Sequence, residues 1–288
     1  MQYKQIRLDV ARTENGSGAT IATLALNKPK KFNAIGPRLA LELDNVFDEI
    51  RHLDPDALVI VGEGENFCAG GDLKVETLSL ERPEDRLGLP DHEYADLFLW
   101  WLNDHFHVVL QRAYQKLELL RMPVIAAIDG VAVGIGFEMT LGCDFRIMTE
   151  RARVAEIAIP VGFLSEWSAT RTLAQLIGAS RATELILTGR FVDASEALRI
   201  GLAHEVVPND QLLGAATALA TRVARQPRLG VRFAKEEIRH YLHSNRSKEG
   251  FELELARILE LTRSEDSIEG VRAFNSKRPV RWQQRGTT

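Results

Sequence analysis

Cysteine and histidine are too few and too scattered in this 288-residue chain to indicate a disulfide framework or a metal site. The only two cysteines, Cys68 and Cys143, adjoin small residues in expected core or loop-to-helix positions. A small buried thiol is therefore the expected role of each. The seven histidines show no ligand spacing, so we predict no metal.

Long apolar runs and dense basic clusters are also missing. No hydrophobic stretch is long enough to span a bilayer, and the N-terminal sequence MQYKQIRLDV does not read as a signal peptide. The net charge is −4 and the pI is about 6.0, without a basic cluster that includes aromatic residues. We therefore expect no membrane partner and no nucleic-acid partner, and a cytoplasmic location by default.

The chain has neither a periodic internal repeat nor a low-complexity linker, and 45% of its residues are hydrophobic. That is enough for one large domain, or for a domain with a helical appendage. Apolar periodicity predicts an α/β order of strands and helices. Strands are expected at 6–10, 20–26, 57–61, 124–128, 145–148 and 154–159, and helices at 38–53, 169–177, 181–187, 195–200, 211–225, 230–242, 249–264 and 267–275.

The segment 75–120 predicts a loop followed by a helix rich in aromatic side chains. Proline and glycine favour the loop in its first half, and the helix is expected from about residue 92. Trp100 and Trp101 belong to this aromatic group. From composition alone, an aromatic stripe on a helix favours core packing over a ligand-lining role.

Residues 122–144, MPVIAAIDGVAVGIGFEMTLGCD, combine an apolar strand, a glycine-rich turn and the start of a helix. The first N–H groups of a helix have no partner inside it, so they suit a negatively charged oxygen. Glu138 lies in the same first turn, and the pattern predicts an oxyanion site with a carboxylate beside it. The helix dipole alone also favours Glu there, which is the structural alternative.

A second glycine turn favours the catalytic interpretation. The sequence GEGENFCAGGDLK at 62–74 follows the strand at 57–61 and places Ala69, Gly70 and Gly71 just before an expected helix. Two such turns can face each other, and each can supply one N–H to the same oxygen.

Together these two segments resemble the crotonase (enoyl-CoA hydratase/isomerase) superfamily. The loop NKPKKFNAI at 27–35 is similar to the family's early CoA-contacting loop, and the segments 187–208 and 269–282 are similar to its turn-and-helix segment and its C-terminal helix. The resemblance implies an α/β fold with a crotonase-type ββα spiral core at 1–208 that binds acyl-CoA. It also implies a helical region at 209–288 that forms a homo-oligomer, either a trimer or a dimer of trimers.

The resemblance further implies that two backbone N–H groups, those of Ala69 and Ile135, bind the thioester oxygen and stabilise an enolate. Glu138 matches the first catalytic Glu of enoyl-CoA hydratases, whereas their second falls on Ala158, which carries no proton. Glu166 stands where 3-enoyl-CoA isomerases carry Glu and dienoyl-CoA isomerases carry Asp. The pair therefore favours double-bond isomerisation over hydration. An acid beside a helix N-cap is the structural alternative for Glu166.

Substrate contacts also follow from the resemblance. The loop at 28–34 and the turn of small residues at 69–71 are expected to hold CoA. The aromatic-rich helix expected from about residue 92 should border the acyl group. A Phe and a Lys from a neighbouring subunit's C-terminal helix join them in this family. The predicted binding residues are Lys28, Lys31, Ala34, Gly70, Asp72, Leu73, Trp100, Gly134, Phe274 and Lys277. No cofactor is expected besides coenzyme A, which is part of the substrate.

Other functions stay open at this point. Enoyl-CoA hydration is the first alternative, with Glu156 or Asp144 in place of the missing acid, although structural roles are expected for both. Further crotonase reactions are C–C cleavage, dehalogenation and thioester hydrolysis. A non-catalytic acyl-CoA-binding or RNA-associated relative is disfavoured, because Glu138 and Glu166 are both present and a basic tract is not.

Overall fold

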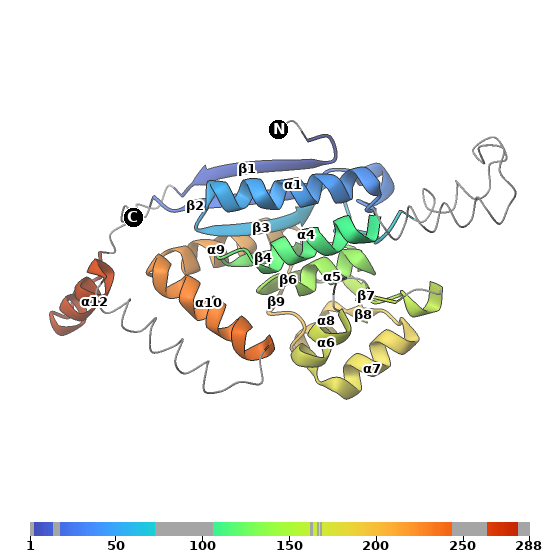
Figure 1. Ribbon diagram of the computed structural model, residues 1–288. Coiled ribbons are helices and arrows are strands. Elements are labelled where there is room, and N and C mark those ends of the chain that lie inside the picture. The colour runs from blue at the N-terminus through green and yellow to red at the C-terminus, as the bar shows by residue number, and fades with distance from the viewer. Residues whose placement is uncertain are drawn as a thin grey trace, which may run out of the picture.

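The structure is a computed structural model that describes residues 3–13, 18–72, 106–161, 164–165, 167, 169–243 and 264–281. Its centre is a six-stranded sheet in the order β1-β2-β3-β4-β6-β9 (Figure 1). The first two strands pair antiparallel and all later neighbours pair parallel. The strands are β1 (Ile6–Arg12), β2 (Thr20–Leu26), β3 (Ala57–Gly62), β4 (Val124–Ile128), β6 (Phe145–Thr149) and β9 (Glu205–Val207).

Strands β3 and β4 are apolar throughout because both faces of the sheet are covered. Along β3, Leu58 and Ile60 belong to one buried cluster, whereas Ala57 and Val59 belong to the other. Helices α1 (Pro37–Leu53) and α4 (Val108–Glu118) cover the first face, and α9 (Leu212–Ala224) covers the second (Figure 1). The region after 208 thus shares a core with the sheet, and the division at 208/209 stays a prediction.

A smaller sheet has the order β5-β7-β8, built from β5 (Val131–Val133), β7 (Arg153–Ala155) and β8 (Val192–Asp193). The strand expected at 154–159 is therefore shorter than predicted. After β7 the chain turns into the 3-10 helix η4 (Ile159–Val161), where the N–H of Val161 donates to the carbonyls of Ile157 and Ala158. Hydrogen bonds within this short helix thus replace the pairing with a neighbouring strand that a longer β7 would make.

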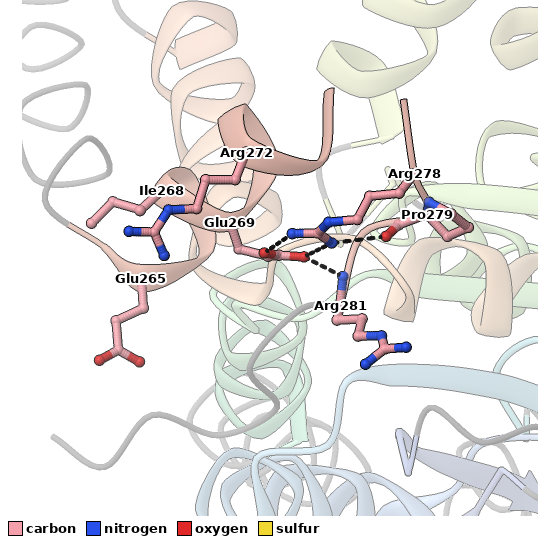
Figure 2. Close-up of a pocket in the computed structure, with 7 residues that line it drawn as sticks. All are labelled: Glu265, Ile268, Glu269, Arg272, Arg278, Pro279 and Arg281. Carbon is pink, nitrogen blue, oxygen red and sulfur yellow. Dashed lines mark hydrogen bonds and ion pairs between the residues drawn. The ribbon is translucent and has the colours of Figure 1, made fainter. Parts of the chain in front are cut away.

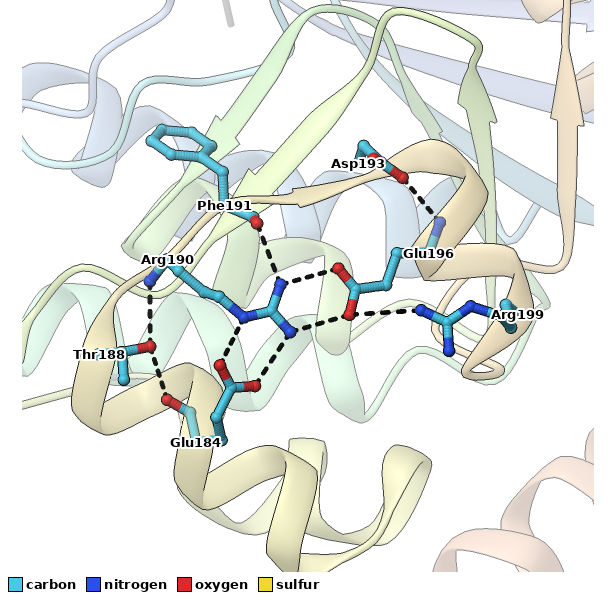
Figure 3. Close-up of polar contacts among 7 residues, drawn as sticks. All are labelled: Glu184, Thr188, Arg190, Phe191, Asp193, Glu196 and Arg199. Atoms are coloured by element: carbon cyan, nitrogen blue, oxygen red, sulfur yellow. Dashed lines mark hydrogen bonds and ion pairs between the residues drawn. The ribbon is translucent and has the colours of Figure 1, made fainter.

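The helices after this sheet match their predicted positions closely: α6 (Ala169–Ile177), α7 (Ala179–Thr188) and α8 (Ala194–Arg199). The turn between α7 and α8 is held by Arg190, which bonds the carboxylates of Glu184 and Glu196 (Figure 3). The Asp193 side chain accepts the N–H of Glu196 and caps α8. One guanidinium thus ties the end of one helix to the start of the next.

The C-terminal helices α10 (Arg228–His243) and α12 (Glu265–Asn275) match the predicted helices at 230–242 and 267–275. All but the last residue of the helix predicted at 249–264, and most of the segment 75–120, lie outside the described residues. Among the helices that the structure describes, none has the length and apolar character needed to cross a membrane.

Candidate active site

The turn between β5 and α5 (Ile135–Leu141) depends on Gly134. Its φ of 50° and ψ of −129° are accessible only to glycine without strain. The N–H of Gly134 donates to the carbonyl of Ala155, and α5 begins at the next residue. Within the described part of the chain, the N–H of Ile135 has no hydrogen-bond acceptor, as expected for the first residue of a helix. The Ile135 side chain is buried in the core.

The second glycine turn lies directly against the first. Cys68 pairs with Ala132, and the N–H of Val133 donates to the carbonyl of Cys68. Gly70 has a φ of 94°, and a Cβ there would lie 2.8 Å from the carbonyl oxygen of Val133. The structure therefore brings together Gly70 and Gly134, which the sequence separates by more than 60 residues.

The donor expected at Ala69 is already used inside the fold. The N–H of Ala69 donates to the carbonyl of Phe32 at 2.9 Å, so we correct this prediction. Gly71, two residues later, pairs with Ile35 in an isolated parallel bridge in which Ile35 bonds to residues 70 and 72. In such a bridge the N–H of Gly71 points away from its partner, and no described residue accepts it. Among the described residues, Gly71 is thus the residue of this turn whose N–H stays unbonded after pairing with residues 32–35.

Glu138 lies in the first turn of α5 and is only 1% exposed. Its Oε2 accepts a short hydrogen bond from the backbone N–H of Trp167. Trp167 is itself fully buried, with its indole ring 5.5 Å from the ring of Tyr114 on α4. The Trp167 backbone thus fixes the orientation of one oxygen of this carboxylate.

The other end of α5 is held by Arg146, which is 2% exposed. Its guanidinium donates to the carbonyls of Thr140, Cys143 and Leu202. The carbonyls of Thr140 and Cys143 lie at the C-terminal end of α5, so the guanidinium ties this helix end to residue 202. Sequence reasoning did not identify this residue, since a single Arg in a strand carries no signal of its own.

The remaining predicted acids have different positions. Glu166 lies outside the described residues. Asp144 is used structurally: its carboxylate accepts the N–H of Val124 and pairs with Lys235. Glu156 is 1% exposed, and its Oε1 accepts the N–H of Ala158. Because Ala155 bonds Gly134, Glu156 follows directly on a residue that contacts the central turn.

The predicted CoA loop forms a compact unit. The Lys28 ammonium lies 2.9 Å from the Asp72 carboxylate and donates to the carbonyl of Ala34. Burial works to raise the pKa of Asp72, but the hydrogen bond and charge of Lys28, with Lys31, outweigh it and the pKa is lowered. Lys28 and Asp72 therefore join the two predicted binding segments, whereas Lys31 is 54% exposed and accessible to a ligand.

The other predicted binding residues are not placed at these turns. Leu73 and Trp100 lie outside the described residues, as does the side chain of Phe274. Lys277 is exposed just after α12. Beside it, Arg278 pairs with Glu269 at the edge of a surface hollow lined by α12 and residues 278–281 (Figure 2). A role for Phe274 and Lys277 at a neighbouring subunit's site stays a prediction.

Sequence reasoning missed two features of the candidate site, the unbonded N–H of Gly71 and the Trp167 N–H that orients Glu138. The sequence contains a partial signal for the first, because AGGD offers three consecutive N–H groups. The structure decides among them: the N–H of Ala69 bonds residue 32 and that of Gly70 bonds the Cys68 sulfur, which leaves Gly71. For the second there is none, since backbone donors have no residue signature. Among the described residues, no group of three His, Cys, Asp or Glu side chains could hold a metal.

Comparison with known proteins agrees with this architecture. A family model described as enoyl-CoA hydratase/isomerase matches residues 16–97 and 102–285. A probable enoyl-CoA hydratase of Mycobacterium tuberculosis is 33% identical over 92% of this chain and 95% of its own length. The short-chain-enoyl-CoA hydratase of Clostridium acetobutylicum is 29% identical over 90% of this chain and 93% of its own.

Solved structures extend the likeness to the fold. The crystal structure of enoyl-CoA hydratase from Bacillus anthracis superposes with a TM-score of 0.79 at 30% identity, covering 97% of this chain and 99% of that one. This confirms the predicted α/β crotonase fold. Since the family match spans both glycine turns, Glu138 and the C-terminal helices, the chain belongs to the enoyl-CoA hydratase/isomerase family of enzymes.

Proposed function

We propose that this enzyme shifts a carbon–carbon double bond in an enoyl-CoA, through an enolate of the thioester. The observation that carries this is the meeting of the two glycine turns, with the N–H groups of Gly71 and Ile135 unbonded within the described residues and the buried Glu138 one helical turn away. That combination provides an electron sink and a proton acceptor in one place.

The two N–H groups supply the electrostatic part of the reaction. A thioester oxygen between Gly71 and Ile135 would gain negative charge as the proton beside the carbonyl leaves, and fixed donors stabilise that charge without reorganising. Loss of one such donor typically costs roughly 100-fold or more in rate. Individual N–H groups carry this argument, since α5 has only seven residues.

Proton transfer needs a base and an acid spaced along the acyl chain. Glu138 would remove the proton from the carbon next to the thioester carbonyl, and the double bond would move as the dienolate forms. A second carboxylate, which we assign to Glu166, would return a proton further along the chain. Ala158 at the second hydratase position supports this assignment, because it can neither donate nor accept that proton.

Hydration of a 2-enoyl-CoA is the second candidate. The relatives named above are called hydratases, and Glu156 is a buried acid next to a residue that bonds the central turn. In that reaction one carboxylate would take a proton from water as the hydroxide adds to the third carbon, and another would protonate the second carbon. Glu156 would then be the partner of Glu138.

Substrate binding follows from the same placement. We assign the exposed Lys31 to the phosphates of CoA, and the Lys28–Asp72 pair to holding the loop that carries it. Phe274 and Lys277 of a neighbouring subunit would complete the CoA site in a trimer or a dimer of trimers. Catalysis by this route needs no metal and no cofactor beyond the CoA of the substrate.

The test offers trans-2-enoyl-, 3-enoyl- and 3,5-dienoyl-CoA to the wild type and to Glu138→Gln, Glu156→Gln and Glu166→Gln. We expect the wild type to isomerise a 3-enoyl or 3,5-dienoyl substrate. Glu138→Gln and Glu166→Gln should lose this activity, and Glu156→Gln should keep it. Hydration lost with Glu138→Gln and Glu156→Gln would support the second candidate. Glu184→Gln, which alters only the Arg190 ion pairs, is the control. Absence of turnover on all three substrates would refute both.

A further inference from the structure

We propose that Asn33 is a positioning residue that holds the N–H of Gly71 in place for the thioester oxygen. This rests on the function proposed above and adds a residue to its machinery. Asn33 is fully buried and has a left-handed φ of 57°, a conformation that Asn adopts more readily than other non-glycine residues.

The side-chain amide of Asn33 joins three separate pieces of backbone. Its Oδ1 accepts the N–H of Lys28 at 2.8 Å, and its Nδ2 donates to the carbonyls of Glu63 and Asn66 at 3.0 and 2.8 Å. Both amide hydrogens are thereby used. The CoA loop is thus fastened to the chain segment that leads from β3 into the glycine turn.

The backbone around Asn33 then bonds to that turn residue by residue. The Asn33 carbonyl lies 3.2 Å from the Cys68 thiol, which donates to it. The carbonyl of residue 32 accepts the N–H of Ala69 at 2.9 Å, and the N–H of residue 35 donates to the carbonyl of Gly70 at 2.8 Å. In this parallel bridge Ile35 bonds residues 70 and 72. The N–H of Gly71, which lies between them, is therefore directed away from the 32–35 segment.

Strand β5 also confines the turn at 69–71. A Cβ at Gly70 would approach the carbonyl of Val133 to 2.8 Å, so the turn has no space to move toward β5. Its position is decided by the 32–35 segment on one side and by residue 133 on the other. Release of Asn33 would free one side, and a displacement of about 1 Å in such a site costs on the order of 100-fold in rate.

The choice of variant separates the side chain from the backbone conformation. Asn33→Gly keeps the left-handed backbone at no steric cost and removes the three amide hydrogen bonds. Asn33→Ser, which retains a shorter hydrogen-bonding group, is the second variant and answers the same question if the first fails to fold. Leu219→Ala on α9 is the control, because it removes packing from the second core without touching either turn.

The readout is the absorbance of a bound enoyl-CoA whose acyl double bond is conjugated with an aromatic ring. Hydrogen bonds to the thioester oxygen polarise that conjugated system and shift its absorbance to longer wavelength. We expect Asn33→Gly to lose most of this shift and to lower kcat at least about tenfold. Binding of free CoA should change by less than about threefold, and Leu219→Ala should keep the shift and kcat while lowering Tm.

Two outcomes overturn the role of Asn33. In the first, Asn33→Gly keeps the wild-type shift and kcat. In the second, the shift, CoA binding and Tm fall together in Asn33→Gly and in Leu219→Ala alike, which would indicate general destabilisation. A wild-type enzyme that binds the ligand without any shift would instead refute the thioester site itself, and the role of Asn33 with it.

Discussion

The ammonium of Lys235 lies 2.6 Å from Oδ2 of Asp144, and only 8% of the lysine side chain is exposed. The same Nζ donates a short hydrogen bond to the carbonyl of Met122. Lys235 belongs to a row of cations at i, i+4, i+7 and i+11 on α10, each of which pairs with Asp54 or Asp144: Arg228, Arg232, Lys235 and Arg239. Ion pairs therefore attach this helix to the core, and Ile238, at 62% exposure, lies on its outer side.

For the Lys235 pair we predict how the free energy of unfolding changes at alkaline pH. Burial lowers the pKa of Lys235 to about 8, against the opposing charge of Asp144. Between about pH 8 and 10.5 the unfolded chain holds a proton that the folded chain has lost, so the free energy of unfolding should rise with pH in this window. One pKa unit corresponds to about 1.4 kcal/mol, which gives a total of a few kcal/mol.

Urea unfolding of wild type and Lys235→Met across this range measures the effect. The wild-type curve should rise relative to that of the variant, because Met cannot titrate. Lys4→Met, at an exposed position, is the control and should run parallel to the wild type. Parallel curves for wild type and Lys235→Met would contradict the assignment.

For Asp44 we predict how the stability of the fold changes at acid pH. It lies on α1 at 4% exposure and bonds Arg112 and Lys116 of α4. Burial would raise its pKa, but the bonds and charges of the two cations outweigh this and lower it. The stabilisation is complete above the ordinary carboxyl pKa of 3.8 and is lost as the pH falls through the lowered folded value.

Thermal unfolding of Asp44→Asn between about pH 6 and 2 tests this relation. The variant should be less stable than the wild type at neutral pH, and the difference should shrink toward the acid end. Asp9→Asn, at an exposed site on β1, should show no such convergence. A gap between wild type and Asp44→Asn that stays constant down to pH 2 would show that the charge of Asp44 is not what ties α1 to α4.

Gly70→Ala should lower activity because the two glycine turns are packed backbone against backbone. The added Cβ would lie 2.8 Å from the carbonyl of Val133, so one turn must move. We expect kcat/KM to fall about 100-fold. Gly178→Ala is the matched control: Gly178 has a φ of 83° but nothing within 4 Å of its added Cβ. Because ψ at Gly178 is 149°, an alanine there adopts a strained backbone, and that control should lose roughly 1–3 kcal/mol of stability with kcat/KM unchanged.

Both cysteines should be inert in the folded enzyme. Cys68 and Cys143 are buried, and this burial raises the pKa of each thiol to about 12. Since the thiolate is the reactive form, a chromogenic disulfide reagent should modify neither thiol before unfolding and both afterwards. Titration of the native and the denatured enzyme measures this, and one rapidly reacting thiol in the native state would exclude the buried role of that residue.

Local pattern was sufficient for much of the architecture. Apolar runs of strand length predicted β3 and β4, and periodic apolar residues predicted α1, because these elements bury residues whose spacing is visible in the chain. The short strands β5, β8 and β9 were not predicted, since segments of two or three residues contain too little periodicity to detect.

For the candidate site, the sequence alone indicated the two glycine turns and placed Glu138 in the first turn of the helix after one of them. Only the tertiary structure decided which amide of the AGGD turn is left for a ligand. Pairing with residues 32–35 consumes the N–H of Ala69 and directs that of Gly71 the other way. It likewise directed Lys28, a predicted CoA-binding residue, toward Asp72. Hydrogen-bond partners far apart in the chain make these choices, and no local pattern records them.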